Sequence, residues 1–286
     1  MVSSVDLYSK TSHVLAKKWS SEDERLLDHA IDLLESPGLT AKLTNALGKV
    51  VEDGLKQLPQ KWSEKINEIT RAALQTSLKV AIATLNTDKH DTPSNFFHKL
   101  SVAATGAAGG AFGLSALALE LPISTTIMLR SIADIARSEG EDFTQTEVAA
   151  ACIEVFALGG KSPEDDASES GYFATRLALS RAITEASQHI AAKGFVEEGA
   201  PALVKLIATV AQRFSIQVSE KAAAQLLPAI GAAGGALVNT LFMSHFQQMA
   251  HGHFVIRRLE RTYGFDEVKK RYMAKLLRET KEITSS

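Results

Sequence analysis

Two carboxylates, Glu120 and Glu154, stand in strongly apolar stretches of this sequence. Glu120 lies in Leu-Glu-Leu-Pro, just before the hydroxyl residues 124–126, and Glu154 lies in Ala-Ala-Cys-Ile-Glu-Val-Phe-Ala-Leu. A carboxylate in such surroundings must be paired, protonated or bound to a cation, because burial penalises its charged form. Both residues are therefore candidate ligands or acid/base groups of a polar pocket. The alternative is a buried network of ion pairs and caps that fixes the register of the helices.

Two groups of charged residues have the spacing of a single helix face. Arg130, Asp134 and Arg137 follow one another at intervals of four and three, and so do His253, Arg257 and Glu260. Residues at these spacings are neighbours on the surface of an α-helix. The pattern predicts an ion-pair ladder on each helix, and both groups are also candidates for the lining of a polar pocket.

Three histidines, His245, His251 and His253, lie close together near the C-terminus. At about 100° per residue, side chains at these positions of one helix point in different directions. The metalloprotease pattern His-Glu-x-x-His is absent from the sequence. A divalent metal would therefore need one of these histidines together with a carboxylate from another helix. The candidate ligands for such a site are Glu120, Glu154, His251 and His253.

Helices must position these residues, because strand signals are nearly absent and helical signals recur throughout the chain. A first helix opens at 20–24 and ends at 36–38, and a capping box at 144–147 opens another, which ends at 159–160. Pro122 is expected to kink or restart a helix that begins at 92–93. The remaining patterns predict helices over about 40–54, from 59 to the polar loop at 86–92, and over 123–139, 172–193, 200–213, 217–229, 232–262 and 266–282.

The hexapeptide Gly-Ala-Ala-Gly-Gly-Ala occurs twice, within the uncharged segments 102–119 and 226–244. Glycine in a helix costs roughly 1 kcal/mol relative to alanine, and the usual reason to repeat it is the close approach of two backbones. The segments therefore predict a multi-helix bundle around two glycine-rich central helices. The alternative is insertion into a bilayer, which their length would allow. Their poor hydrophobicity, without a flanking Trp/Tyr belt or Lys/Arg asymmetry, favours the buried core.

The composition fits a single all-α domain. Apolar residues make up 45% of the chain and aromatic residues 6%, as in closely packed helices. No Ser/Gly-rich linker divides the chain, so residues 21–286 are expected to form one domain after an N-terminal extension over 1–20. The net charge of -2, from 31 basic and 33 acidic residues, gives no support for nucleic-acid binding. The single cysteine, Cys152, excludes an intrachain disulfide and is expected to be buried, and the N-terminus lacks a secretory signal, which predicts a cytoplasmic protein.

The run 119–137, Leu-Glu-Leu-Pro-Ile-Ser-Thr-Thr-Ile-Met-Leu-Arg-Ser-Ile-Ala-Asp-Ile-Ala-Arg, resembles the EcsC protein family. The resemblance continues through 140–142, 156–160, 169–176 and 253–264, and it covers roughly residues 25–280. It implies a bacterial helical protein that is cytoplasmic or peripheral to the inner face of the membrane. The operon that gives the family its name also encodes an ABC transporter and is linked to protein secretion. The resemblance supplies no catalytic residues, but its motifs contain Glu120, Arg130, Asp134, Tyr172, Arg176, His253, Arg257 and Glu260.

Three functions compete at this point. The first is a membrane-peripheral helical protein whose partners are membrane lipid or a transport or secretion complex. The second is a metal-binding protein or hydrolase with a buried carboxylate/histidine pocket, and the third is a module that binds a partner helix along a groove of small residues. The basic residues of 257–271 are interleaved with acids, which indicates a solvated face, with anionic lipid as the alternative contact. A nucleophile elbow, a P-loop, a dinucleotide fingerprint and a kinase signature are all absent from the sequence.

Overall fold

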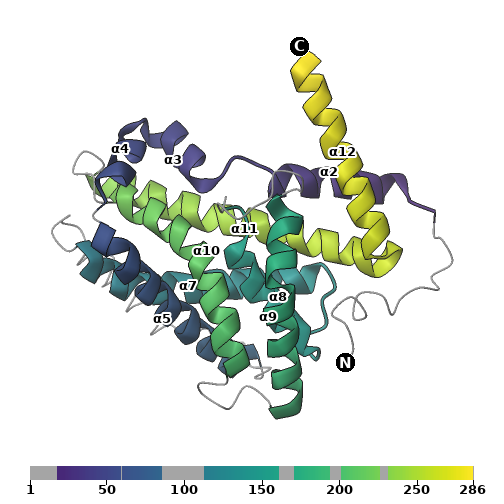
Figure 1. Ribbon diagram of the computed structural model, residues 1–286, viewed down its shortest axis with the longest axis horizontal. Coiled ribbons are helices and arrows are strands. Elements are labelled where there is room, and N and C mark those ends of the chain that lie inside the picture. The colour runs from purple at the N-terminus through teal and green to yellow at the C-terminus, as the bar shows by residue number, and fades with distance from the viewer. Residues whose placement is uncertain are drawn as a thin grey trace.

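The computed structural model describes residues 18–58, 60–85, 113–160, 171–193, 201–225 and 231–285. These residues form α-helices, one short 3-10 helix and connecting turns, without a strand among them. The all-α class expected from the sequence is therefore confirmed. Figure 1 shows a bundle in which α11 (Gly231–Tyr263) runs along the long axis, while α12 (Phe265–Ser285) starts at the end of α11 and extends away from the other helices.

The N-terminal part of the bundle contains four helices. They are α2 (Ser21–Leu34), α3 (Leu39–Leu47), α4 (Val50–Gln57) and α5 (Gln60–Leu85). Ser20 caps α2, since its hydroxyl accepts a hydrogen bond from the Asp23 backbone N–H at 3.0 Å. The single helix predicted over 40–54 is wrong, because Gly48 ends α3 with a positive φ of 86° and a new helix begins at Val50.

The remaining helices begin with α7 (Gly113–Ser138), which continues through Pro122 as one helix. The Pro122 carbonyl accepts a hydrogen bond from the Thr126 hydroxyl at 2.7 Å. The others are α8 (Thr146–Glu154), the 3-10 helix η1 (Val155–Ala157), α9 (Gly171–Lys193) and α10 (Pro201–Gln225). The helix boundary predicted between 213 and 217 does not occur, because no glycine or proline interrupts α10 there. The capping box at 144–147 does not form either, since Thr144 bonds to Asp142 and the N-cap residue is Gln145.

The core that joins the helices is aromatic at its centre. Phe156 of η1, Phe214 of α10 and Phe246 of α11 are buried, with ring centroids between 4.9 and 5.5 Å apart. Cys152 is also buried in α8, as expected, and burial raises the pKa of its thiol to about 12. None of the helices described is both long enough and apolar enough to cross a membrane.

The glycine-rich segments are only partly described. The first hexapeptide, 106–111, lies outside the described residues, so the packing of two glycine faces stays a prediction. In α11, a Cβ atom added at Gly235 would meet no described atom within 4 Å, and Leu237 is exposed. The close helix contact in the described residues lies elsewhere, where a Cβ at Gly252 would be 2.6 Å from Leu34 Cγ of α2.

Candidate functional site

Three buried polar side chains meet between α8, α9 and α11. Glu154 is the last residue of α8, Tyr172 lies in the first turn of α9, and His253 faces both from the middle of α11. A hydrogen bond of 3.0 Å joins Tyr172 Oη to His253 Nδ1, and Glu154 Oε2 lies 3.7 Å from His253 Nε2. His253 has no exposed surface. The structure thus brings together three of the residues that the sequence singled out, and we call them the Glu154–His253–Tyr172 triad.

Two arginine–glutamate pairs flank the triad. Arg176 of α9 donates two hydrogen bonds to Glu260 of α11, at 2.5 and 3.0 Å. Arg257 of α11 donates two to Glu141, in the turn after α7, at 2.8 and 3.0 Å. The ladder predicted along α11 from His253 to Glu260 is therefore wrong in its pairing, because each charged member bonds to another part of the chain. Bidentate pairs of this kind fix orientation as well as charge.

The surroundings move the pKa values of the triad in opposite directions. Burial raises the pKa of the Glu154 carboxyl to about 7, although Arg176 and Arg257 favour its charged form. Burial, and then the positive charges of the same two arginines, lower the pKa of the His253 imidazole well below its usual value. Burial also raises the pKa of the Tyr172 hydroxyl. The proton that the triad can gain near neutral pH therefore resides on Glu154, while His253 stays neutral.

Glu120 is not part of the triad. Its carboxylate accepts a hydrogen bond of 2.5 Å from Lys221 of α10, a side chain that is 1% exposed. The Lys221 ammonium also lies 4.7 Å from the centroid of the Phe242 ring. The pair joins α7 to α10, and it gives Glu120 the partner that a carboxylate in an apolar stretch requires.

The other sequence candidates lie outside the triad as well. Asp134 pairs with Arg137 at 2.8 Å on the exposed side of α7, which is one step of the ladder predicted there, whereas no described ion pair joins Asp134 to Arg130. His251 is exposed, whereas its neighbour His253 is buried. Within the residues that the structure describes, no group of three or more histidine, cysteine, aspartate or glutamate side chains is arranged to hold a metal. The proposed ligand set of Glu120, Glu154, His251 and His253 is therefore not assembled, apart from the adjacent Glu154 and His253.

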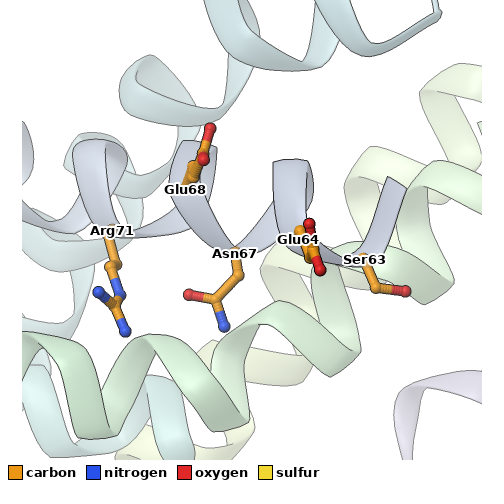
Figure 2. A pocket seen from close by; sticks show the side chains of 5 residues that line it. All are labelled: Ser63, Glu64, Asn67, Glu68 and Arg71. Carbon is orange, nitrogen blue, oxygen red and sulfur yellow. The ribbon is translucent and has the colours of Figure 1, made fainter. Parts of the chain in front are cut away.

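A surface depression of about 440 Å³ lies along α5. Figure 2 shows that its five lining side chains all come from this one helix, with Glu68 pointing away from Arg71 and Asn67. Glu68 already pairs with Lys65 at 2.7 Å. A ligand site usually gathers polar groups from several elements around an apolar cavity. The depression lacks that arrangement, and we assign it no chemistry.

The helix α12 presents a basic face, of which the sequence had indicated only the part up to residue 271. One side of α12 is tied to α2, where Lys275 pairs with Glu24 at 3.2 Å and also contacts Asp28. On the same side, the Tyr272 hydroxyl donates to Glu35 at 2.7 Å. The opposite side is exposed. Its residues are Lys270, Ala274, Leu277 and Arg278, and we call them the outer face of α12.

The residues of the outer face follow at helical spacing, so their side chains form one stripe. Leu277 is 60% exposed, and Lys270 and Arg278 are exposed on either side of it. Asp266, one turn before Lys270, is the acidic residue at the base of the stripe. Other basic residues of α12 are paired with acids; Arg271, for example, forms ion pairs with Glu24 and Glu267. The sequence alone could not show which basic residues of α12 have an acidic partner among the described residues and which do not.

The comparisons with known proteins agree with the resemblance drawn from the sequence. The model of the EcsC protein family matches residues 9–259, which is most of the chain. The matched region contains the whole triad and both arginines that flank it, and it ends before Glu260 and α12. No curated protein and no solved structure matches the chain significantly.

Proposed function

The chain belongs to the EcsC protein family, and we propose that it is a cytoplasmic protein that attaches to anionic lipid at the inner face of the membrane. The observation that carries this proposal is the outer face of α12. It combines two exposed basic residues, Lys270 and Arg278, with the exposed Leu277 on a helix that extends from the bundle. A helix with an apolar residue between basic ones can lie in the plane of a membrane interface.

The expected affinity is modest. A basic residue near an anionic bilayer contributes about 1 kcal/mol, and the attraction falls off within a Debye length. Two such residues and one leucine therefore support reversible attachment that weakens as salt is added. We further propose that the attached protein works with a membrane transport or secretion complex. The family resemblance supports this partner, while the lipid contact is supported by α12 itself.

Vesicle flotation tests the lipid contact. The full chain is mixed with vesicles of phosphatidylcholine alone, or with added phosphatidylglycerol, and centrifuged through a density gradient. We expect the protein to float with the anionic vesicles only, and the charge reversal K270E/R278E to reduce the floating fraction several-fold. The matched control is K56E/K61E, which reverses two exposed lysines on α4 and α5. Protein that stays at the bottom with both vesicles, or equal losses in the two variants, would overturn the proposal.

A second candidate function, a metal-binding protein or hydrolase, is supported by the adjacency of Glu154 and His253 at 3.7 Å. The pairing of Glu120 with Lys221 speaks against the larger pocket first expected. Elemental analysis of protein purified without chelator decides this candidate, since a metal site predicts a stoichiometric divalent ion that E154Q loses. The third candidate function is a helix-binding module. Its support is the open space beside Gly235, where an added Cβ would meet no described atom within 4 Å.

A further inference from the structure

The triad contains a polar atom that its surroundings leave without a partner. His253 Nδ1 is hydrogen-bonded to Tyr172 Oη, but His253 Nε2 is buried and has no hydrogen-bond partner among the described residues. The nearest carboxylate oxygen, Glu154 Oε2, lies at 3.7 Å, just beyond hydrogen-bond distance. A small movement of the Glu154 side chain closes this gap. The closed arrangement is a continuous chain from α8 through α11 to α9.

The charged groups around the triad are already committed to one another. Arg176 is held by Glu260 and Arg257 by Glu141, each through two hydrogen bonds. Neither arginine donates a hydrogen bond to Glu154 in the described structure. Glu141 is shared with Arg261, so these three arginines have two glutamate partners, and their charge favours an ionised Glu154 while burial opposes it. Other described groups close to these pairs are neutral or engaged. Tyr272 of α12 stacks on Tyr172, Arg213 of α10 donates to Thr175, and Arg261 of α11 bonds to Glu141. The thiol of Cys152 in α8 stays protonated, because burial raises its pKa to about 12.

We propose that the Glu154–His253–Tyr172 triad is a proton-driven switch, in which one proton at Glu154 sets the direction of the whole hydrogen-bond chain. In the protonated state, the Glu154 O–H donates to His253 Nε2, and Nδ1–H donates to Tyr172 Oη. In the ionised state, Nε2–H donates to the Glu154 carboxylate, and the Tyr172 O–H turns to donate to Nδ1. The imidazole changes tautomer between the two states and stays neutral in both, and the one proton lost goes to solvent.

The burial of Glu154 and His253 determines which of the two groups titrates. Because Glu154 has a pKa of about 7 and the pKa of His253 is far lower, the switch works by ionising the carboxyl rather than by charging the imidazole. The last member of the chain touches α12, since the rings of Tyr172 and Tyr272 stack with centroids 5.8 Å apart. The switch therefore reaches the base of the helix that bears the outer face. It does not depend on the lipid proposal, because its test involves no membrane.

Nitrogen-15 NMR of the full chain with labelled histidines tests the switch. A ring nitrogen that carries a proton has a different chemical shift from one that does not, so the spectrum shows which tautomer is present. The His253 signals are assigned by their loss in H253Q. At a pH well below the Glu154 pKa of about 7, we expect the His253 imidazole to carry its proton on Nδ1. At a pH well above this value, we expect the proton on Nε2. We expect E154Q to abolish this change and E147Q, at an exposed position of the same helix, to leave it intact. A His253 tautomer that is constant across the titration, or an imidazolium at low pH, would overturn the proposal even if E154Q failed to fold.

Discussion

His245 of α11 packs directly on Gly159, in the turn that follows η1. A Cβ atom at Gly159 would lie 2.6 Å from His245 Cε1 and 2.7 Å from Met249 Sδ, and its φ of 74° is in the left-handed region. Both side chains are buried, so neither can move away without opening the core. Position 159 therefore requires glycine for two reasons, namely its left-handed backbone conformation and its close contact with His245 and Met249.

The first prediction follows from this contact. Gly159→Ala should destabilise the protein by about 2–5 kcal/mol, the sum of overpacking and a left-handed alanine. Urea denaturation followed by circular dichroism measures the change. Gly171→Ala is the control, because a Cβ there meets no described atom within 4 Å. An equal stability of the two variants would mean that the turn tolerates a side chain.

The second prediction concerns the buried carboxyl of Glu154. Because its pKa is raised from 4.5 to about 7, the folded state holds a proton that the unfolded chain releases, so stability is lost as the pH rises between these two values. Glu154→Gln removes this dependence and should be more stable than the wild type above pH 7, by up to about 3 kcal/mol. Thermal denaturation across this pH range gives both curves. Glu147→Gln should run parallel to the wild type, and parallel curves for Glu154→Gln would contradict the burial of an ionisable carboxyl.

The third prediction concerns the ion pair beside the triad. Arg176 and Glu260 are 6% and 11% exposed, so removing one partner leaves a buried charge. Arg176→Met should therefore cost about 3–5 kcal/mol, whereas R176M/E260Q should recover part of the loss. The exposed pair of Asp134 and Arg137 provides the comparison, and Asp134→Asn should change stability little. A small effect of Arg176→Met in urea denaturation would show that water reaches the pair.

The helices were largely predictable, because their signals are local. Ser20 caps α2 with its hydroxyl, and the glycine near 159 ends the helical segment that begins in α8. The failures came from ambiguous local signals. The helix expected over 123–139 is the continuation of α7, because Pro122 removes one backbone donor without ending the helix. A single glycine at 48 broke a segment whose apolar pattern continued on both sides.

The candidate site was predictable only in part, because helical spacing reveals a shared face and not what that face meets. The sequence placed His253, Arg257 and Glu260 on one side of α11, but it could not supply their partners. Glu260 bonds to a residue 84 positions earlier, and Glu120 bonds to one 101 positions later. The outer face of α12 was predictable only up to residue 271 for the same reason, since the acids of α2 decide which described basic residues are paired.

The last prediction concerns Gly252, a single glycine within α11 that lies outside the repeated hexapeptide. A Cβ at this position would lie 2.6 Å from Leu34 Cγ and 3.1 Å from the backbone oxygen of Ala30, both in α2. Gly252→Ala should therefore push α2 away and cost about 1–3 kcal/mol, and Leu34→Ala alone should cost about 2–5 kcal/mol through the cavity it leaves.

The two changes should not be additive, because they act on the same space. In G252A/L34A the new methyl group occupies part of the cavity, so the loss should be smaller than the sum of the single losses. The contact with the Ala30 oxygen remains, so the double variant should still be less stable than the wild type. A double-mutant cycle in urea measures the coupling. Strict additivity would show that α2 and α11 do not approach each other at Gly252, and that the bundle is held together there by other contacts.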